Sequence, residues 1–406
     1  MRRCAAILFA AQALGILGCD PEQVSEIHYD PYVGEAYPDR RAPVVVPPGG
    51  MGIVTDSLSD TLSLLDLGTG TRFGTVPVGR DPVGIDGPHH VAVDQAAGTA
   101  FVALSYPVLA ASGPHASHGS SVQSGFAQKL ALDDFRILGQ VRVDENPGDI
   151  VLSQDGKRLV VSHFDLQKAI ASQGDPEKAR ATLAVIDPET LALTGSPDPV
   201  RITTCTAPHG VALSRPDGAR AYIACYGDDT LTVVDLVAGK VIERVPVAPV
   251  PGLPGAPNYG PYSAVLSPDG STVAIGNTVS KDVRFFDVAS GTVDPARTVA
   301  TLGAPYFPSW SPDGALLYIP LQAPDGVVVI DVANGNAEVA RRDFASGECR
   351  SPHLAEVMGA EIWVVCEGDH KSNGEVLRLD STSLATMKTI EVGIYPDSLV
   401  RVGGTP

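Results

Sequence analysis

Basic residues and long hydrophobic runs are both scarce in this sequence. The 29 Lys and Arg residues are outnumbered by 47 Asp and Glu residues, which gives a formal net charge of −18. A field of that sign repels nucleic-acid phosphates and anionic lipid surfaces. After the first twenty residues, no apolar run is long enough to span a bilayer. These absences exclude nucleic acid as a partner and leave the membrane only a role at the N-terminus.

Familiar catalytic motifs are missing as well. The chain has no Gly-x-Ser-x-Gly elbow, no His-Glu-x-x-His helix and no phosphate-binding loop. It also lacks the Cys-x-x-Cys-His motif that attaches c-type haem. A hydrolase would therefore depend on scattered carboxylates near histidine, such as Asp165, Asp228, Glu367 and Asp369 with His209, and no spacing selects them.

The N-terminus has the pattern of a secretory signal. Two arginines precede an apolar run from Ala5 to Leu17, and Ile-Leu-Gly-Cys ends at Cys19. This tetrapeptide resembles a bacterial lipobox, so residues 1–18 are predicted to be a lipoprotein signal peptide and Cys19 the lipidated residue. The alternative is an ordinary signal peptide with a chance cysteine. Residues 19–50, rich in Pro, Gly and acidic groups, are predicted to be a flexible tether to a bacterial cell envelope.

A repeat begins at Met51 and continues to the C-terminus. Each copy has a proline, an alternating apolar strand, a turn, a second strand, a variable loop and a third strand that ends on aspartate. Seven prolines occupy the first column: Pro88, Pro147, Pro208, Pro261, Pro305, Pro352 and Pro396. Seven aspartates occupy the last: Asp66, Asp133, Asp187, Asp235, Asp287, Asp331 and Asp380. The pattern predicts an all-β, seven-bladed β-propeller over residues 51–406.

The two ends of this repeat complement each other. Pro396 begins an inner strand that has no second or third strand behind it, whereas Met51–Asp66 supplies strands without an inner one. We therefore expect the C-terminal strand to close the first blade and to remove exposed sheet edges.

One copy carries a family resemblance. The segment VALSRPDGARAYIACYGDDTLTVVDL, which starts at Val211, resembles the YVTN-type propellers and is similar to bacterial lactonase-like and surface-layer propeller proteins. The resemblance extends over nearly all of residues 51–402. It implies the fold, but such propellers include binding proteins, lyases, lactonases and cofactor-bearing oxidoreductases, so it does not specify an activity.

Histidines gather on one face of the predicted ring. His89, His209 and His353 each follow a column proline, in line with Tyr262, Tyr306 and Asp397 of other blades. His90 also starts an inner strand, and further histidines lie at or after second strands on the same face: His163, His115, His118 and His370. His115 and His118 belong to the long insertion of their blade, which could cover the site. Converging imidazoles are ligands for copper, zinc or iron, so a transition-metal site is one hypothesis for this face. In it, His89, His209 and His353 are the ligands, and the auxiliary residues come from the remaining set: His90, His163, His115 or His118. The alternative is that the repeat merely copies a structural histidine.

The cysteines repeat in the same way. Cys205 and Cys349 precede a column proline by three residues, and Cys225 and Cys366 end the second strand of the same blades. Antiparallel pairing predicts the disulfides Cys205–Cys225 and Cys349–Cys366. The alternative is that Cys and His together bind a soft metal.

Three functions follow from these patterns. The first is a monomeric, lipid-anchored scaffold that binds a small ligand or a protein partner through the histidine-rich rim, with no certain cofactor. The second is a metal-binding redox or metal-handling propeller. The third is a lactonase-like hydrolase.

Overall fold

The computed structural model describes residues 41–80, 84–108, 118–193 and 195–404. The predicted signal peptide, Cys19, most of the tether and His115 lie outside these residues. Among the described residues, no helix has the length and the hydropathy that crossing a bilayer requires.

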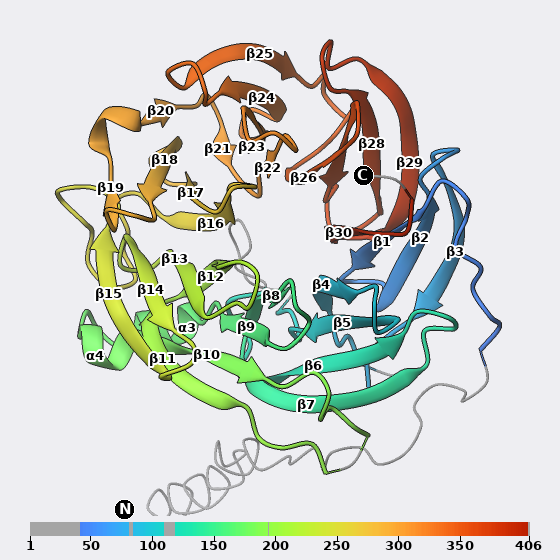
Figure 1. Cartoon of the computed structure of the whole chain (residues 1–406), viewed down its shortest axis with the longest axis horizontal. Coiled ribbons are helices and arrows are strands. Elements are labelled where there is room, and N and C mark those ends of the chain that lie inside the picture. Colours follow the sequence, from blue (N-terminus) through green and yellow to red (C-terminus); the bar gives the residue numbers. More distant parts are fainter. Residues whose placement is uncertain (1–40, 81–83, 109–117, 194, 405–406) are drawn as a thin grey trace, which may run out of the picture. The chain divides into compact units, whose positions relative to one another are not determined.

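The described chain forms seven antiparallel sheets arranged radially around a common axis (Figure 1). We number them as blades 1 to 7 and give their strands from the axis outwards. Blade 1 contains β30 (Pro396–Val402), β1 (Met51–Asp56), β2 (Thr61–Asp66) and β3 (Thr71–Pro77). Blade 2 contains β4 (Pro88–Asp94), β5 (Thr99–Leu104), β6 (Ser124–Ala131) and β7 (Ile137–Glu145). Blade 3 contains β8 (Pro147–Leu152), β9 (Leu159–His163), β10 (Arg180–Ile186) and β11 (Val200–Thr206).

The remaining blades follow the same order. Blade 4 contains β12 (Pro208–Leu213), β13 (Arg220–Cys225), β14 (Thr230–Asp235) and β15 (Lys240–Pro246). Blade 5 contains β16 (Pro261–Leu266), β17 (Thr272–Asn277), β18 (Asp282–Asp287), β19 (Thr292–Val293) and β20 (Val299–Ala300). Blade 6 contains β21 (Ala304–Pro305), β22 (Ser309–Trp310), β23 (Leu316–Gln322), β24 (Gly326–Asp331) and β25 (Ala337–Asp343). Blade 7 contains β26 (Pro352–Met358), β27 (Glu361–Cys366), β28 (Asn373–Asp380) and β29 (Thr386–Ile394).

The predicted ring closure is confirmed. β30 pairs antiparallel with β1, and the register joins Met51 to Val402 and Asp56 to Pro396. The last strand of the chain is thus the innermost strand of the first blade. Closure of this kind leaves no inner sheet edge for another chain to pair with.

The repeat as read from sequence missed one strand per blade. It contained three strands, whereas each blade also has an outer strand after the closing aspartate, such as β3, β15 and β25. These strands are largely exposed or half-buried along their length. With little buried surface to cover, they have no apolar alternation that a pattern search could detect.

Most closing aspartates cap the turn into this outer strand. Asp235 Oδ1, for example, accepts hydrogen bonds from the backbone N–H groups of Val237 (3.0 Å) and Ala238 (2.8 Å). Asp133 differs, because its carboxylate contacts the guanidinium of Arg136 while Asp134 accepts from the Arg136 backbone. The column is therefore structural, as its turn position indicates.

Some parts of the described chain lie outside the repeat. Blade 3 carries a helical insertion, α3 (Leu166–Ala171) and α4 (Pro176–Ala179), and blade 5 carries the short 3-10 helix η2 (Pro295–Arg297). Residues 41–50 already contact the propeller, because the Val44 backbone N–H donates to Asp133 O (2.6 Å). The end of the segment interpreted as a tether thus lies against blade 2.

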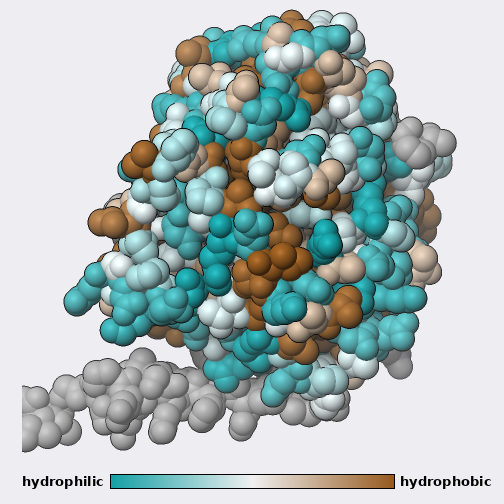
Figure 2. Space-filling view, turned by 60° about the vertical axis from the view of Figure 1, so that its left-hand side comes forward, coloured by the Kyte–Doolittle hydropathy of each residue, from teal (hydrophilic) through white to brown (hydrophobic). Residues whose placement is uncertain are grey.

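The outer surface is mixed. On the side that carries blades 4 and 5, hydrophobic patches alternate with larger hydrophilic areas (Figure 2). Several exposed apolar side chains belong to these blades, among them Val250, Leu253 and Leu302.

Candidate functional site

The column prolines place the histidines at one end of the axis. The register pairs Pro88 with Leu104, Pro208 with Cys225, and Pro352 with Cys366. The start of each inner strand therefore lies beside the end of the second strand, as predicted. His89, His209 and His353, one residue after their prolines, are fully buried at this end.

The first donor set combines three distant parts of the chain. His89 comes from β4, His118 from the loop between β5 and β6, and Asp397 from β30. His118 Nε2 lies 3.3 Å from Asp397 Oδ2, and His89 Nε2 lies 3.9 Å from Asp397 Oδ1. All three side chains are fully buried. Their donor atoms lie within 4.8 Å of one another, a spacing that one metal ion can bridge.

These separations suit an ion better than a direct hydrogen bond. A charge-assisted N–H···O bond is about 2.8 Å long. Two ligand atoms that share a tetrahedral ion at about 2.1 Å from each are about 3.4 Å apart. The 3.3 Å and 3.9 Å separations are closer to the second value.

Oxygen atoms hold the other nitrogen of each ring. His89 Nδ1 lies 3.1 Å from Pro147 O, and His118 Nδ1 lies 3.0 Å from Ser105 Oγ. Such partners orient a ligating imidazole, so that Nε2 faces the centre. Neither His89 Nε2 nor Asp397 Oδ1 has a hydrogen-bond partner within the described parts of the chain. Burial, with the adjacent His118, lowers the pKa of His89 well below its usual value, which leaves this ring neutral.

A second imidazole–carboxylate pair lies beside this set. His90 Nδ1 contacts Asp149 Oδ1 at 2.8 Å, and Asp149 Oδ2 accepts from the Val211 backbone N–H at 3.0 Å. His90 Nε2 makes no hydrogen bond to any described residue. The His90 ring centroid is 4.6 Å from that of His89. Asp149 was not singled out in the sequence, although it stands two residues after Pro147, as His90 stands two after Pro88.

Blade 7 adds a third pair nearer the surface. His370 Nε2 lies 2.8 Å from Glu367 Oε2, and the His370 ring stacks on Tyr395 with centroids 3.6 Å apart. The Tyr395 ring lies 4.8 Å from that of His118. Burial acts to lower the pKa of His370, but the hydrogen bond and charge of Glu367 outweigh it and raise that pKa. His353 Nδ1 donates to the Asp397 backbone oxygen at 2.9 Å.

The two tyrosines predicted for the rim, Tyr262 and Tyr306, pack against histidine rings of the cluster. Tyr262 stacks on His209 with ring centroids 3.9 Å apart, and Tyr306 lies 5.5 Å from His353. Burial raises the pKa of both phenols far above the usual value, so they stay neutral. Asp397, from the same column, belongs to the first donor set instead.

His163 is engaged within blade 3. Its Nδ1 donates to Thr182 O at 2.8 Å, and its Nε2 accepts from the Asp144 backbone N–H at 3.1 Å. With both nitrogens bonded in this way, His163 has no lone pair available for an ion.

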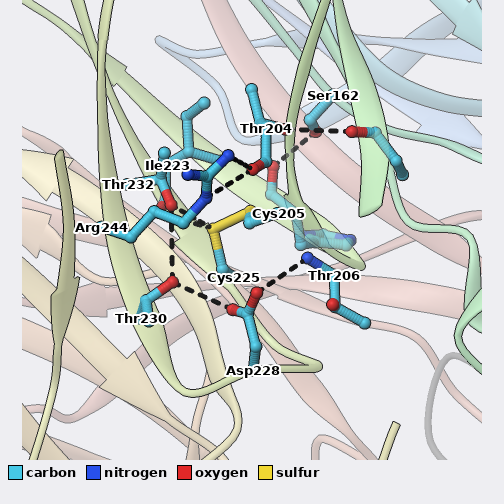
Figure 3. Close-up of a disulfide and its surroundings, with 12 residues drawn as sticks. Ser162, Thr204, Cys205, Thr206, Ile223, Cys225, Asp228, Thr230, Thr232 and Arg244 are labelled. Atoms are coloured by element: carbon cyan, nitrogen blue, oxygen red, sulfur yellow. Dashed lines mark hydrogen bonds between the residues drawn. A yellow bond between two sulfur atoms is a disulfide. The ribbon is translucent and has the colours of Figure 1, made fainter. Parts of the chain in front are cut away.

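Both predicted disulfides are confirmed. Cys205 bonds to Cys225 and Cys349 to Cys366, with Cα atoms 6.0 Å and 5.3 Å apart. Figure 3 shows the first bridge, beside which Asp228 accepts hydrogen bonds from the Thr206 backbone and from Thr230. The bonded sulfurs rule out the alternative in which these cysteines bind metal.

The comparisons with known proteins support the fold. No protein-family model matches the chain, and no curated protein sequence matches it. The periplasmic gluconolactonase of Pseudomonas aeruginosa is similar in structure, at 18% identity and a TM-score of 0.63 over 87% of this chain and 99% of that chain. Hydrazine synthase of Kuenenia stuttgartiensis is similar at 19% identity and a TM-score of 0.57, over 77% of this chain and 89% of that one.

A third similar structure is dihydro-heme d1 dehydrogenase NirN, with 14% identity and a TM-score of 0.56 over 90% of this chain and 77% of that one. The three have different activities and share little sequence with this protein. Their likeness shows the seven-bladed propeller fold alone, and a function must be argued from the site.

Proposed function

We propose that the protein binds a divalent transition-metal ion through His89, His118 and Asp397. Two imidazoles and a carboxylate suit Zn²⁺ or Cu²⁺ better than Mg²⁺ or Ca²⁺, which prefer oxygen ligands alone. This proposal corresponds to the second of the three functions expected from the sequence, a metal-binding propeller. Of the three histidines taken as ligands from sequence, it keeps His89 and assigns His209 and His353 to the surrounding packing.

The spacing of the three donor atoms in a fully buried cluster carries this proposal. Burying a carboxylate costs several kcal/mol unless a positive charge or hydrogen bonds offset it. Asp397 Oδ2 accepts one hydrogen bond from Ser57 Oγ (2.6 Å), and Asp397 Oδ1 accepts none from the described residues. An ion between Asp397, His89 and His118 would supply that positive charge and use both Nε2 lone pairs.

We place this activity at the bacterial envelope. The lipobox-like segment ending at Cys19 supports lipid anchoring, and two disulfides fit an oxidising compartment. A monomer that meets the membrane only through its anchor agrees with the acidic charge of −18.

Metal titration of the chain produced without a His-tag tests the proposal. We expect calorimetry with Zn²⁺ or Cu²⁺ to give tight binding, and the variants His118→Ala and Asp397→Asn to lose at least tenfold in affinity for the ion at this site. His163→Ala, which changes a histidine with both nitrogens bonded, is the matched control and should keep wild-type affinity. Equal affinity in all four proteins, or no binding in any, would refute the proposal.

A second function, lactonase-like hydrolysis, has one observation in its favour. His90 and Asp149 form an oriented imidazole–carboxylate pair whose side chains are still 4% and 9% exposed. Such a pair can act as a general base. Turnover of a sugar lactone that disappears in His90→Gln, with metal binding retained, would favour this function.

A further inference from the structure

We propose that blade 7 supplies a second, outer metal position, formed by Glu367 and His370 and bridged to the inner ion by Asp397. This inference rests on the proposed function, because the inner ion is bound by the same aspartate. It makes the site dinuclear and gives the ion a route from the surface.

The carboxylate of Asp397 lies between the inner donor set and blade 7. Oδ2 lies 3.3 Å from His118 Nε2, and Oδ1 lies 3.9 Å from His89 Nε2. Oδ1 is also 3.5 Å from Nδ1 of His353 in blade 7. Because Oδ1 lies near both groups, this carboxylate is placed to bridge two ions.

Glu367 lies close enough to share the outer ion. The donor atoms of His353, Glu367 and Asp397 lie within 4.8 Å of one another. His370 Nε2 is 2.8 Å from Glu367 Oε2, so an ion at Glu367 would take this nitrogen as its imidazole ligand. His353 Nδ1 donates to the Asp397 backbone, and we therefore treat His353 as a positioning residue and not as a ligand.

Charge favours a cation at this place. The side chains of Asp397 and Glu367 are 0% and 3% exposed, and two buried carboxylates this close repel each other when both are ionised. The ion pairs observed with them involve histidines, which provide positive charge only when protonated. A divalent ion would stabilise both carboxylates and leave the imidazoles neutral.

Exposure rises in steps towards the surface. The side chain of Asp397 is fully buried, that of Glu367 is 3% exposed and that of His370 is 36% exposed. Cys366, which precedes Glu367, is bonded to Cys349, and Asp369 accepts from the Ser372 and Lys371 backbones. The outer pair is thus held firmly while one ligand remains accessible, as a loading position requires.

The test is the number of ions that each chain binds. After removal of metal, equilibrium dialysis with Zn²⁺ should give two ions per chain for wild type and one for Glu367→Gln and for His370→Ala. Glu375→Gln and Lys371→Ala, which change nearby residues of the same blade, are the matched controls and should keep two.

Electron paramagnetic resonance gives a second readout. Two Cu²⁺ ions bridged by Asp397 should couple and weaken the isolated Cu²⁺ signal in wild type, and His370→Ala should restore it. One ion in wild type, or two ions retained in both blade 7 variants, would overturn the outer position and leave the proposed function intact. No ion in any protein would overturn both.

Discussion

Blades 4 and 7 carry the same cysteine-bridged hairpin, with a Cys-x-x-Pro-His segment before the inner strand and a cysteine at the end of the second strand. After that cysteine, blade 4 continues with Tyr226 and later Asp229, and blade 7 places Glu367 and His370 at the same two positions. Asp229 and His370 even share a positive φ, at 55° and 59°. The scaffold is therefore the same, and only the side chains differ.

The difference in side chains changes what each loop holds. Asp229 accepts hydrogen bonds from four backbone N–H groups of the segment that leads into blade 5. Tyr226 packs against Phe164 with ring centroids 5.5 Å apart. The blade 4 loop is thus fastened to protein, whereas Glu367 and His370 turn towards the histidine cluster. We infer that one repeat position can serve stability in one blade and binding in another.

The largest expected effect comes from removing Asp229. Asp229→Ala leaves four amides without their acceptor, so we expect the free energy of unfolding to fall by about 4 kcal/mol. His370→Ala should leave that free energy nearly unchanged. Urea denaturation of both variants measures the contrast, and a similar loss in the two would remove the distinction between the blades.

The two disulfides should have equal effects on stability and unequal effects on binding. Replacing either pair by serine should lower the free energy of unfolding by about 2–4 kcal/mol. Only the Cys349/Cys366 double variant should also weaken metal binding, because Cys366 directly precedes Glu367 and its bridge helps to hold that side chain in place. Chemical denaturation and metal titration of both double variants test this prediction. Weaker metal binding in the Cys205/Cys225 variant alone would contradict it.

Stability should depend on pH through a buried carboxyl group where blade 7 meets blade 1. Gly393 N–H donates to Asp56 Oδ1, and burial raises the pKa of Asp56 from 3.8 to about 6. Between pH 3.8 and about 6, the folded state keeps the Asp56 proton that the unfolded state has lost. The free energy of unfolding should therefore fall as pH rises through this range. The fall attributable to Asp56 is about 3 kcal/mol at most.

The variant Asp56→Asn isolates this effect. Its free energy of unfolding, measured by urea denaturation between pH 4 and pH 7, should lack the decline that wild type shows. Parallel curves for wild type and variant would mean that Asp56 does not titrate in this range.

The smallest expected effect, a change in Tm, concerns the closing aspartates of blades 4 and 7. Asp235 and Asp380 both cap the turn before the outer strand with backbone hydrogen bonds. Asp235→Ala and Asp380→Ala should therefore lower Tm by the same few degrees without changing metal binding. Asp133→Ala, which removes no backbone cap, is the control, and thermal denaturation monitored by circular dichroism compares the three.

Most of the fold could be predicted from the sequence because the same residue types recur at the same positions of each blade. Proline cannot donate to a ladder hydrogen bond, so a column of prolines marks where inner strands start. The unpaired strand after Pro396 and the missing inner strand before Met51 could be matched by counting alone. The outer strands were missed because they bury too little surface to impose an apolar pattern.

Only part of the site could be predicted from the sequence. The histidines after column prolines could be placed at one end of the axis, because antiparallel pairing fixes that end. The sequence placed His118 in a loop that could cover this site, but it did not indicate that the ring would stack on His89 with centroids 4.0 Å apart. It also gave no sign that Asp149 would orient His90. These pairs join different blades and loops, and their geometry depends on how the ring closes.

The sequence by itself determined the number of blades, the closing strand, the two disulfides and the face on which the histidines lie. These features follow from local periodicity and from pairing rules that hold in every blade. Only the tertiary structure decided which histidines meet which carboxylates, that His163 is bonded elsewhere, and that Glu367 turns inward. It also decided that Asp228 bonds to Thr206 and Thr230, and that Asp369 caps a turn. Those choices depend on contacts between blades, where residues far apart in the chain compete for one buried space.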